Sequence, residues 1–591
     1  MTVMPTLRRS RRPRTRARLT ALIAAITLLG SLLTALAVTP AGAKTANPGD
    51  TPDFGPNVKI FDPSMSSSDI QSQLDSIFNQ QQGNEFGGDR YAVMFKPGTY
   101  SNDVNVGYYT QALGLGLNPD DVTINGGLHV QDQGGGALVN FWRGAENLAV
   151  NPPGGTDTWA VSQSSPLRRV DIHGDLQLSD TGYSSGGFLA DSNVTGQVRS
   201  GSQQQWLSRN TSWGSWDGSN WNMVFVGAQN APAQSFPNPP DTTVDQTPVV
   251  REKPFLYVDG SGNYQVFVPG LRTNTAGTTW GGGAAPGTSL PISKFYIAKP
   301  GDTADTVNGA LTAGQNLLFT PGVYHLGSAI HVTRPDTVVL GLGLATLTPD
   351  NGTAAMTVDD VNGVQIAGLL FDAGQTSSQQ LLEVGPSGSG TDHSGDPTTL
   401  SDVFFRVGGA GVGKVKQALV INSDNVITDD MWIWRADHGD GVGWYDNTAD
   451  NGVVVNGDNV TAYGLAVEHF QQYQVIWNGN GGRTYFFQNE MPYDVPDQGT
   501  WRGDGNGYAA YKVADNVTDH QAWGLGSYCY FSTNPGVVAD RAFEAPNTSG
   551  VSFHGLVTVS LGGTGTINNI INDAGGSVNS GNTVADLTNY P

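Results

Sequence analysis

Residues 456–468 of the 591-residue chain read NGDNVTAYGLAVE, and residues 478–490 read NGNGGRTYFFQNE. Each stretch places a turn rich in Asn, Gly and Asp before a short strand with alternating apolar side chains. The same unit occurs at residues 422–434 and at residues 362–372. A unit of this size cannot bury its apolar face alone, but stacked units bury one continuous core. The repeat therefore predicts a parallel β-helix, whose sharp turns use Gly and Asn at positions of positive φ.

A longer repeat indicates that this architecture occurs twice. FKPGTY at residues 95–100 precedes LGLGL at residues 113–117, and FTPGVY at residues 319–324 precedes LGLGL at residues 340–344. The first motif recurs after 224 residues and the second after 227. We therefore predict an all-β protein of two tandem right-handed parallel β-helix domains, pectin-lyase-like, which lie side by side with a cleft between them.

Composition and low-complexity stretches agree with this division. Glycine accounts for 79 of the 591 residues and charged residues for only 14%, against about 7% and about 25% in ordinary chains. A stretch rich in Gly and Thr predicts a linker at residues 276–290. The N-terminal β-helix domain is then expected at residues 44–275. The C-terminal one, at residues 291–591, carries the paired acidic side chains described below.

The N-terminus has the pattern of an export signal. Seven arginines lie within residues 8–18, an apolar run follows at residues 21–38, and Ala41-Gly42-Ala43 fits cleavage after a small residue. We predict a signal peptide at residues 1–43 and a secreted, extracellular protein with no membrane contact after cleavage. An uncleaved membrane anchor is the alternative.

The rest of the chain is strongly acidic. The full sequence has a formal charge of −22, and removal of residues 1–43 takes away seven arginines and no acid. This balance argues against binding to nucleic acid or to an anionic membrane. One cysteine, Cys529, excludes an intramolecular disulfide, and we expect it to be buried.

The 22-residue offset places two acidic side chains in one column. Strand alternation directs Leu465 and Val467 inward, so Ala466 and Glu468 face outward. Glu490 takes the position of Glu468 one coil later. Adjacent strands lie about 4.8 Å apart, and two close carboxyls resist ionising together, so one is expected to hold a proton. Trp434 takes the same column one coil earlier, with Asp437 just beyond it. A proton-holding carboxyl beside an exposed indole is typical of a glycosidase.

Two readings of this column are open. Outward acids on a β-helix are often only solvated. The segments at residues 432–445 and 485–501 nevertheless combine aromatic rings, carboxylates and amides with few Lys or Arg, which suits a neutral polyol. His438 and His469 are interpreted as structural or sugar-contacting residues.

Five segments resemble glycoside hydrolase family 55. They are WRADHG at 434–439, VEHFQ at 467–471, FQNEMPY at 487–493, FWRGAEN at 141–147 and SQQQW at 202–206. The resemblance covers the whole chain after the signal. It implies an inverting β-1,3-glucanase, mostly acting from chain ends, built of two tandem parallel β-helices with the cleft between them.

The resemblance also implies roles for individual residues. Glu490 is expected to be the general acid that protonates the departing glycosidic oxygen. Glu468 and Asp437 are expected to line the subsite and to assist this acid, and Trp434 and Tyr493 to contact sugar.

Further roles are implied for the first β-helix. Gln163 and Ser192 are the best matches for the side chains that hold the attacking water. Phe188 stands where many relatives are expected to have a tyrosine, and it joins Trp444 among the expected substrate contacts. No cofactor and no metal site is predicted, although calcium held by scattered Asp residues stays open.

Three classes of function remain in competition. The first is a secreted, monomeric hydrolase of laminarin-type β-1,3-glucan. The second is another β-helix polysaccharide enzyme, such as a pectate lyase or a polygalacturonase. The third is a non-catalytic glycan-binding β-helix protein, which need not keep Glu490. Exo versus endo action and tolerance of β-1,6 branches are also left open.

Overall fold

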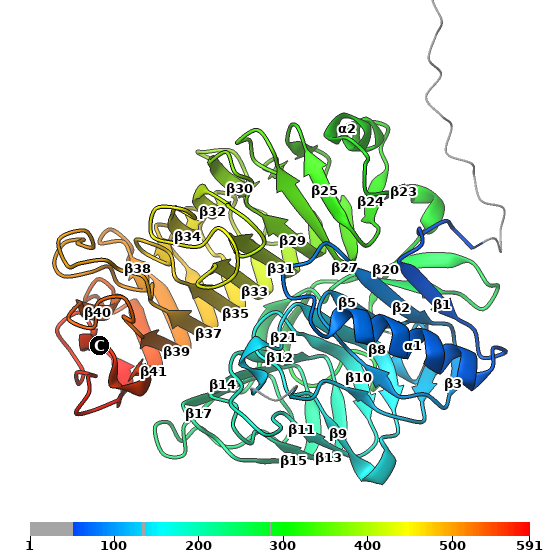
Figure 1. The fold of residues 1–591 in the computed structure, drawn as a ribbon, viewed down its shortest axis with the longest axis horizontal. Helices are drawn as coiled ribbons and strands as arrows, with labels where there is room; N and C mark the ends of the chain where they lie inside the picture. The colour runs from blue at the N-terminus through cyan, green and yellow to red at the C-terminus, as the bar shows by residue number, and fades with distance from the viewer. Residues whose placement is uncertain (1–50, 133–135, 284) are drawn as a thin grey trace, which may run out of the picture. The chain divides into compact units, whose positions relative to one another are not determined.

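The computed structural model describes residues 51–132, 136–283 and 285–591 (Figure 1). The predicted signal peptide at residues 1–43 lies outside the described residues. Within the described ranges, no helix has the length and apolar character needed to cross a membrane.

The first half of the described chain is built of parallel strands. Its main path consists of β1 (Val58–Phe61), β2 (Tyr91–Phe95), β5 (Thr110–Gly114), β8 (Arg143–Val150), β10 (Leu167–Ile172), β12 (Gly187–Ala190), β14 (Gln205–Arg209), β16 (Asn222–Val226) and β17 (Asp241–Val244). The other strands of its coils are β3 (Gly98–Tyr100), β4 (Val104–Asn105), β6 (Val122–Ile124), β7 (Leu128–His129), β9 (Thr156–Thr158), β11 (Asp175–Gln177), β13 (Asn193–Arg199) and β15 (Ser212–Asp217). We call this part the first β-helix.

The second half repeats the architecture with longer strands, which run next to one another in Figure 1. One sheet contains β23 (Phe295–Ala298), β24 (Asn316–Phe319), β25 (Val323–Leu326), β27 (Val338–Pro349), β29 (Gln365–Asp372), β31 (Thr399–Val407), β33 (Ile427–Arg435), β35 (Thr461–Glu468), β37 (Gly482–Glu490), β39 (His520–Cys529), β41 (Val551–Ser560) and β43 (Val584–Tyr590). The other contains β26 (Ile330–Val332), β28 (Met356–Val358), β30 (Ser378–Val384), β32 (Val415–Ile421), β34 (Ala449–Val455), β36 (Val475–Trp477), β38 (Tyr511–Val513), β40 (Val538–Glu544) and β42 (Thr566–Ile571). All these pairings are parallel except that of β43 with β41. The predicted parallel β-helix is confirmed.

Antiparallel strands occupy the segment between the two β-helices. β18 (Thr247–Val250) pairs with β21 (Arg272–Thr275), and β19 (Phe255–Val258), β20 (Tyr264–Pro269) and β22 (Gly287–Pro291) form a three-stranded sheet. β22 begins inside the stretch predicted as a linker. That stretch therefore contributes backbone hydrogen bonds to a sheet.

The long-range repeat reflects the same local structure at the start of each β-helix. A helix precedes the second strand in both halves, α1 (Ser67–Gln81) before β2 and α2 (Ala304–Thr312) before β24. The turns after these strands use Gly98 and Gly322, at φ of 147° and 156°. A Cβ at either position would lie 2.7 Å or less from a proline ring carbon. Both the backbone conformation and the close approach therefore require glycine.

A column of left-handed residues bends the long strands of the second β-helix where they face the first. Gly464 and Gly524 belong to this column, at φ of 64° and 71°. A Cβ on Gly464 would lie 3.2 Å from the ring of Phe188, and a Cβ on Gly524 would lie 2.3 Å from Val224. These glycines therefore allow the first β-helix to pack directly on the bend.

Buried ion pairs join the two β-helices at this contact. The Arg168 guanidinium bonds Asp402 and Asp429 at 2.7 Å each. Arg209 bonds Asp429 at 2.8 and 2.9 Å, and Glu252 through both terminal nitrogens at 2.7 Å. All five side chains are at most 4% exposed. Charges so deeply buried are tolerated because each has a bonded partner of opposite sign.

Candidate active site

The ends of adjacent strands bring Glu468 and Glu490 to one edge of the second β-helix. Trp434 pairs with Glu468 between β33 and β35, and Ala466 pairs with Gln488 between β35 and β37. The predicted register is therefore confirmed, with the two glutamates in equivalent positions of neighbouring coils. The side chains of this column face the first β-helix.

Glu490 lies in a mostly buried environment of aromatic and basic groups. Its side chain is 21% exposed, and the Tyr493 hydroxyl donates a hydrogen bond to Oε2. Nε2 of His469 lies 4.0 Å from the same oxygen. Burial raises the pKa of Glu490 against the opposing effects of His469 and Tyr493, and the charge of Asp437 also acts to raise it. A carboxyl with a raised pKa retains the proton that a general acid must deliver.

Asp437 keeps its negative charge beside this acid. Burial opposes ionisation, but the hydrogen bond from His438 and the charges of two imidazoles hold the pKa of Asp437 at about 2. His438 bonds Asp437 at 2.9 Å and Glu85 at 2.6 Å. These two acids outweigh burial and raise the pKa of His438 to about 10. The result is an ionised carboxylate that favours the protonated form of Glu490.

Glu468 is held across the contact between the two β-helices. Its side chain is 3% exposed, and the indole N–H of Trp432 donates to Oε2 at 2.7 Å. Gln163 of the first β-helix donates to Oε1 at 2.9 Å. Burial and the nearby Glu490 raise the pKa of Glu468, although both hydrogen bonds oppose this shift. Glu468 therefore fixes the position of Gln163 beside the predicted acid.

Other polar groups of the first β-helix reach the strand that carries Glu490. Gln488 donates to the Ser185 hydroxyl at 3.1 Å, and Gln205 donates to the carbonyl of Phe487 at 3.3 Å. Tyr528 donates a hydrogen bond to the side-chain oxygen of Gln205. The last residues of β37 thus lie opposite a row of hydroxyl and amide groups.

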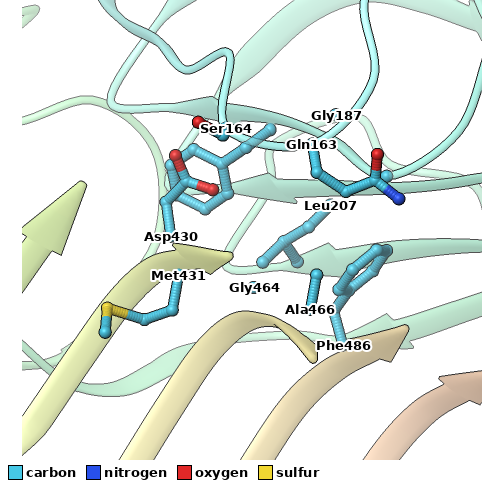
Figure 2. Close-up of a pocket in the computed structure, with 11 residues that line it drawn as sticks. Gln163, Ser164, Gly187, Leu207, Asp430, Met431, Gly464, Ala466 and Phe486 are labelled. Carbon is cyan, nitrogen blue, oxygen red and sulfur yellow. The ribbon is translucent and has the colours of Figure 1, made fainter. Parts of the chain in front are cut away.

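Figure 2 shows the closed space next to these groups, between Gln163 and Ser164 on one side and Asp430, Ala466 and Phe486 on the other. The space is too narrow to admit a water molecule. It is therefore an internal packing gap and not the substrate site. The open side of the site lies toward Glu490 and Tyr493, which are partly exposed.

Two predicted sugar contacts are buried instead. The expectation of an exposed indole at Trp434 is wrong, because Trp434 is 2% exposed and stacks on Trp432 at 5.0 Å between ring centres. Phe188 is 1% exposed and lies 4.6 Å from the Arg168 guanidinium. Trp434 faces outward from its own β-helix, as predicted, and Phe188 does the same, but in each case the other β-helix covers the side chain. They hold the two halves together and present no ring face to a ligand.

The prediction for Ser192 also fails. Its hydroxyl is fully buried, donates to the carbonyl of Ala190 at 2.7 Å and accepts from the N–H of Val170 at 3.1 Å. Ser192 therefore stabilises neighbouring coils of the first β-helix. The sequence analysis did not select Ser185, the serine of the first β-helix that does contact the strand of Glu490 through Gln488. Its place just before β12, and the place of Gln488 two residues before Glu490, could have suggested this contact.

Tyr493 and Trp444 were also expected to contact substrate, and only Tyr493 lies beside Glu490. Tyr493 lies beside Glu490 and packs edge-on against His469 and Tyr530. Trp444 is partly buried, and the Arg435 guanidinium lies 5.7 Å from its ring. Of the aromatic residues near the acids in the sequence, Trp501 is fully buried in the core of the second β-helix. The number of aromatic residues in segments 432–445 and 485–501 is therefore a poor guide to how many aromatic rings are exposed at the site.

The described residues contain one group with the ligand spacing of a metal site. It consists of Asp120, Asp171 and His173 on the first β-helix, outside the site around Glu490. Asp437 bonds Nδ1 of His438 at 2.9 Å and lies 3.9 Å from Nε2 of His469, and these imidazoles compete with a cation.

A proton-holding glutamate at the junction of two parallel β-helices, opposite amide and hydroxyl groups, defines a polysaccharide-hydrolysing glycosidase. The LAM55 pectate lyase-like domain matches residues 295–490. An exo-beta-1,3-glucanase of Streptomyces sp. (strain SirexAA-E / ActE) is 54% identical over 563 residues, which cover 94% of this chain and 92% of that protein. The chain belongs to glycoside hydrolase family 55 and is a β-1,3-glucan hydrolase.

Solved structures agree with this assignment. The structure of sacteLam55A from Streptomyces sp. SirexAA-E has a TM-score of 0.90 at 53% identity, covering 91% of this chain and 99% of that one. An ensemble-refined glutamate-to-alanine variant of sacteLam55A in complex with glucose has the same TM-score and identity, with 92% and 99% covered.

Proposed function

We propose that this protein is a secreted enzyme that releases glucose from the ends of laminarin-type β-1,3-glucan with inversion of the anomeric carbon. Glu490 acts as the general acid and protonates the departing glycosidic oxygen. The observation that carries this proposal is the raised pKa of Glu490 on the partly exposed side of the junction, beside the ionised Asp437.

Inversion is supported by the position of Glu468. A retaining enzyme needs a second carboxylate as a nucleophile about 5–5.5 Å from the acid, on the other side of the sugar ring. Glu468 lies on the same edge as Glu490, is 3% exposed, and has both oxygens bonded to N–H donors. Buried on the same edge as the acid, it is not placed to attack the anomeric carbon from the opposite side. The attacking group is therefore a water.

The first β-helix supplies the groups to hold this water. Gln163 uses its N–H to bond Glu468, which leaves its carbonyl oxygen as an acceptor. The Ser185 hydroxyl lies against Gln488, two residues before the acid. Both groups come from the opposite side of the junction, as attack from the face opposite the leaving group requires.

Other parts of the proposal have independent support. The 54% identical relative is an exo-beta-1,3-glucanase, which favours action from chain ends here. The arginine-rich and apolar pattern of residues 1–43 favours secretion. Asp437 and Tyr493 are assigned to the sugar subsite next to the acid, and the protein is proposed to work as a monomer without a cofactor.

Product analysis on linear laminarihexaose tests the proposal. Proton NMR during the first minutes is expected to show α-glucose and laminaripentaose. Initial β-glucose would overturn inversion, and initial di- or trisaccharides would overturn action from the chain end. Polygalacturonate serves as the control polymer and is expected to give no product.

A further inference from the structure

A second polar pocket lies on the first β-helix, outside the site around Glu490. It is an open pocket of about 570 Å³ and is lined by Asp120, Asp171, Asn193, Ser212, Gln229 and Trp280, among others. We call it the Trp280 pocket. The site around Glu490 uses none of these side chains.

The floor of the Trp280 pocket is a column of polar side chains in successive coils. Asp171 pairs with Asn193, Asn193 with Ser212, and Ser212 with Gln229. Neighbouring strands are about 4.8 Å apart, so the column runs for roughly 14 Å. Asn193 donates to Asp171 at 2.8 Å, and Ser212 donates to Asn193 at 2.7 Å. These bonds orient the donors and acceptors before any ligand arrives.

Trp280 forms one wall of the pocket and is held in place by the backbone of the first β-helix. Its indole N–H donates to the carbonyl of Asp191 at 2.8 Å, and the neighbouring Thr279 bonds the carboxylate of Asp191 through its N–H and its hydroxyl. The indole remains partly exposed. A ring that is fixed before binding offers a flat apolar face at little cost in conformational entropy.

The acidic lining of the Trp280 pocket favours a neutral ligand with hydroxyl groups over an anionic one. Asp120 and Asp171 contribute two carboxyls, and none of the described lining residues is Lys or Arg. An anionic chain is therefore repelled, whereas hydroxyl groups can donate to the carboxyls and to the amide oxygens.

The Trp280 pocket is separate from the catalytic residues. Gly186 lies against Gln488 at the start of β12, and Asn193 follows seven residues later along β12 and β13. Between these two positions the chain leaves β12 and turns at Asp191, at φ of 49°, before β13 begins. Between them, Phe188 fills the contact between the two β-helices.

We propose that the Trp280 pocket is a second carbohydrate site that binds a β-1,3-glucan chain without cleaving it. The polymer would stack on the Trp280 indole and bond the polar column while another chain end occupies the site of Glu490. The assignment to β-1,3-glucan rests on the proposed function. A divalent cation at Asp120, Asp171 and His173 is the competing occupant.

The test compares binding to polymer with hydrolysis of a short substrate, in the full-length protein. Trp280→Ala removes the stacking face. Gly282→Arg adds bulk at a lining position where a Cβ has open space within 4 Å. Trp216→Ala is the matched control, since Trp216 is a partly exposed tryptophan of the same β-helix that packs on Trp213 and Phe225 outside the pocket.

Laminarin affinity electrophoresis measures binding, and kcat/KM on laminaritriose measures the catalytic site. Trp280→Ala and Gly282→Arg are each expected to weaken laminarin retention roughly ten-fold, as for the loss of a buried aromatic contact. Their kcat/KM on laminaritriose is expected to stay within about two-fold of the wild type, because the pocket is remote. Trp216→Ala is expected to change neither value.

Retention equal to the wild type in both pocket variants would overturn the second site. An equal loss of retention and of laminaritriose hydrolysis would also overturn it, because the pocket would then be part of the catalytic site. If Ca²⁺ stabilises the wild type but not Asp120→Asn, and laminarin retention is the same in all variants, the pocket is a cation site. Failure of the wild type to cleave laminaritriose would contradict the proposed function separately.

Discussion

Replacement of Glu490 by Gln tests the central assignment, because it removes a proton donor and keeps the shape of the side chain. General acid catalysis contributes about 10²–10⁴-fold, which corresponds to about 3–5 kcal/mol of transition-state stabilisation. We therefore expect kcat on laminaritriose to fall by about 10²–10⁴-fold. Glu544→Gln on β40, whose carboxylate bonds only Lys512, is the matched control and is expected to keep full activity.

The same variant gives an opposite prediction for stability. Burial raises the pKa of Glu490 in the folded protein, so the folded state loses stability as the pH rises from the unfolded pKa through the folded one. Gln at this position is neutral at every pH and therefore does not destabilise the folded state as the pH rises. The Tm of Glu490→Gln at pH 7 is expected to equal or exceed that of the wild type, and this advantage is expected to vanish below pH 4.

The assay combines laminaritriose hydrolysis with an aryl β-glucoside whose leaving group needs no protonation. Glu490→Gln should lose much less activity on the aryl substrate, because the missing proton is not required there. A loss of less than ten-fold on laminaritriose would refute the assignment of Glu490 as the acid. Equal losses on both substrates would refute it as well, and a lowered Tm would show that misfolding contributes.

Four further changes test the site and the contact between the two β-helices. Asp437→Asn removes a negative charge that raises the pKa of Glu490, so the alkaline limb of the pH profile of kcat/KM should move to lower pH. Ser185→Ala should lower kcat at least roughly ten-fold if its hydroxyl helps to hold the water, and should also lower the free energy of unfolding by about 1–3 kcal/mol, because the N–H of the buried Gln488 loses its acceptor. Ser192→Ala should instead leave the N–H of a buried strand unsatisfied and lower the free energy of unfolding by about 1–3 kcal/mol, with kcat unchanged. Asp429→Asn should destabilise the protein by about 3–5 kcal/mol in urea unfolding, because two buried guanidinium groups lose their shared carboxylate; unchanged stability would show that the ion pairs do not join the halves.

The repeating coil and its register were predictable because they depend on short-range geometry. Strand side chains alternate with a period of two, and each turn uses residues that accept positive φ. A fixed coil length of 22 residues between Glu468 and Glu490 therefore places both on one edge, and the structure has them there. The duplicated strand, turn and strand around Gly98 and Gly322 follow from the same local rules.

The environment of each outward side chain was not predictable in this way. Alternation shows that Trp434, Phe188 and Glu468 leave their own core, but not whether solvent or another part of the chain covers them. In each case the other β-helix buries the side chain, so that Trp434 and Glu468 are covered by the first β-helix and Phe188 by the second. It also brings Gln163 to Glu468, although 305 residues separate them in sequence.

The chain alone was thus sufficient for the fold, the strand register and the acidic column, since each arises from contacts between neighbouring coils. Which outward residues line an open site, which serine faces the acid and which aromatic rings are buried depended on how one β-helix packs on the other. That packing arises from contacts between residues hundreds of positions apart, for which neither periodicity nor spacing carries a signal.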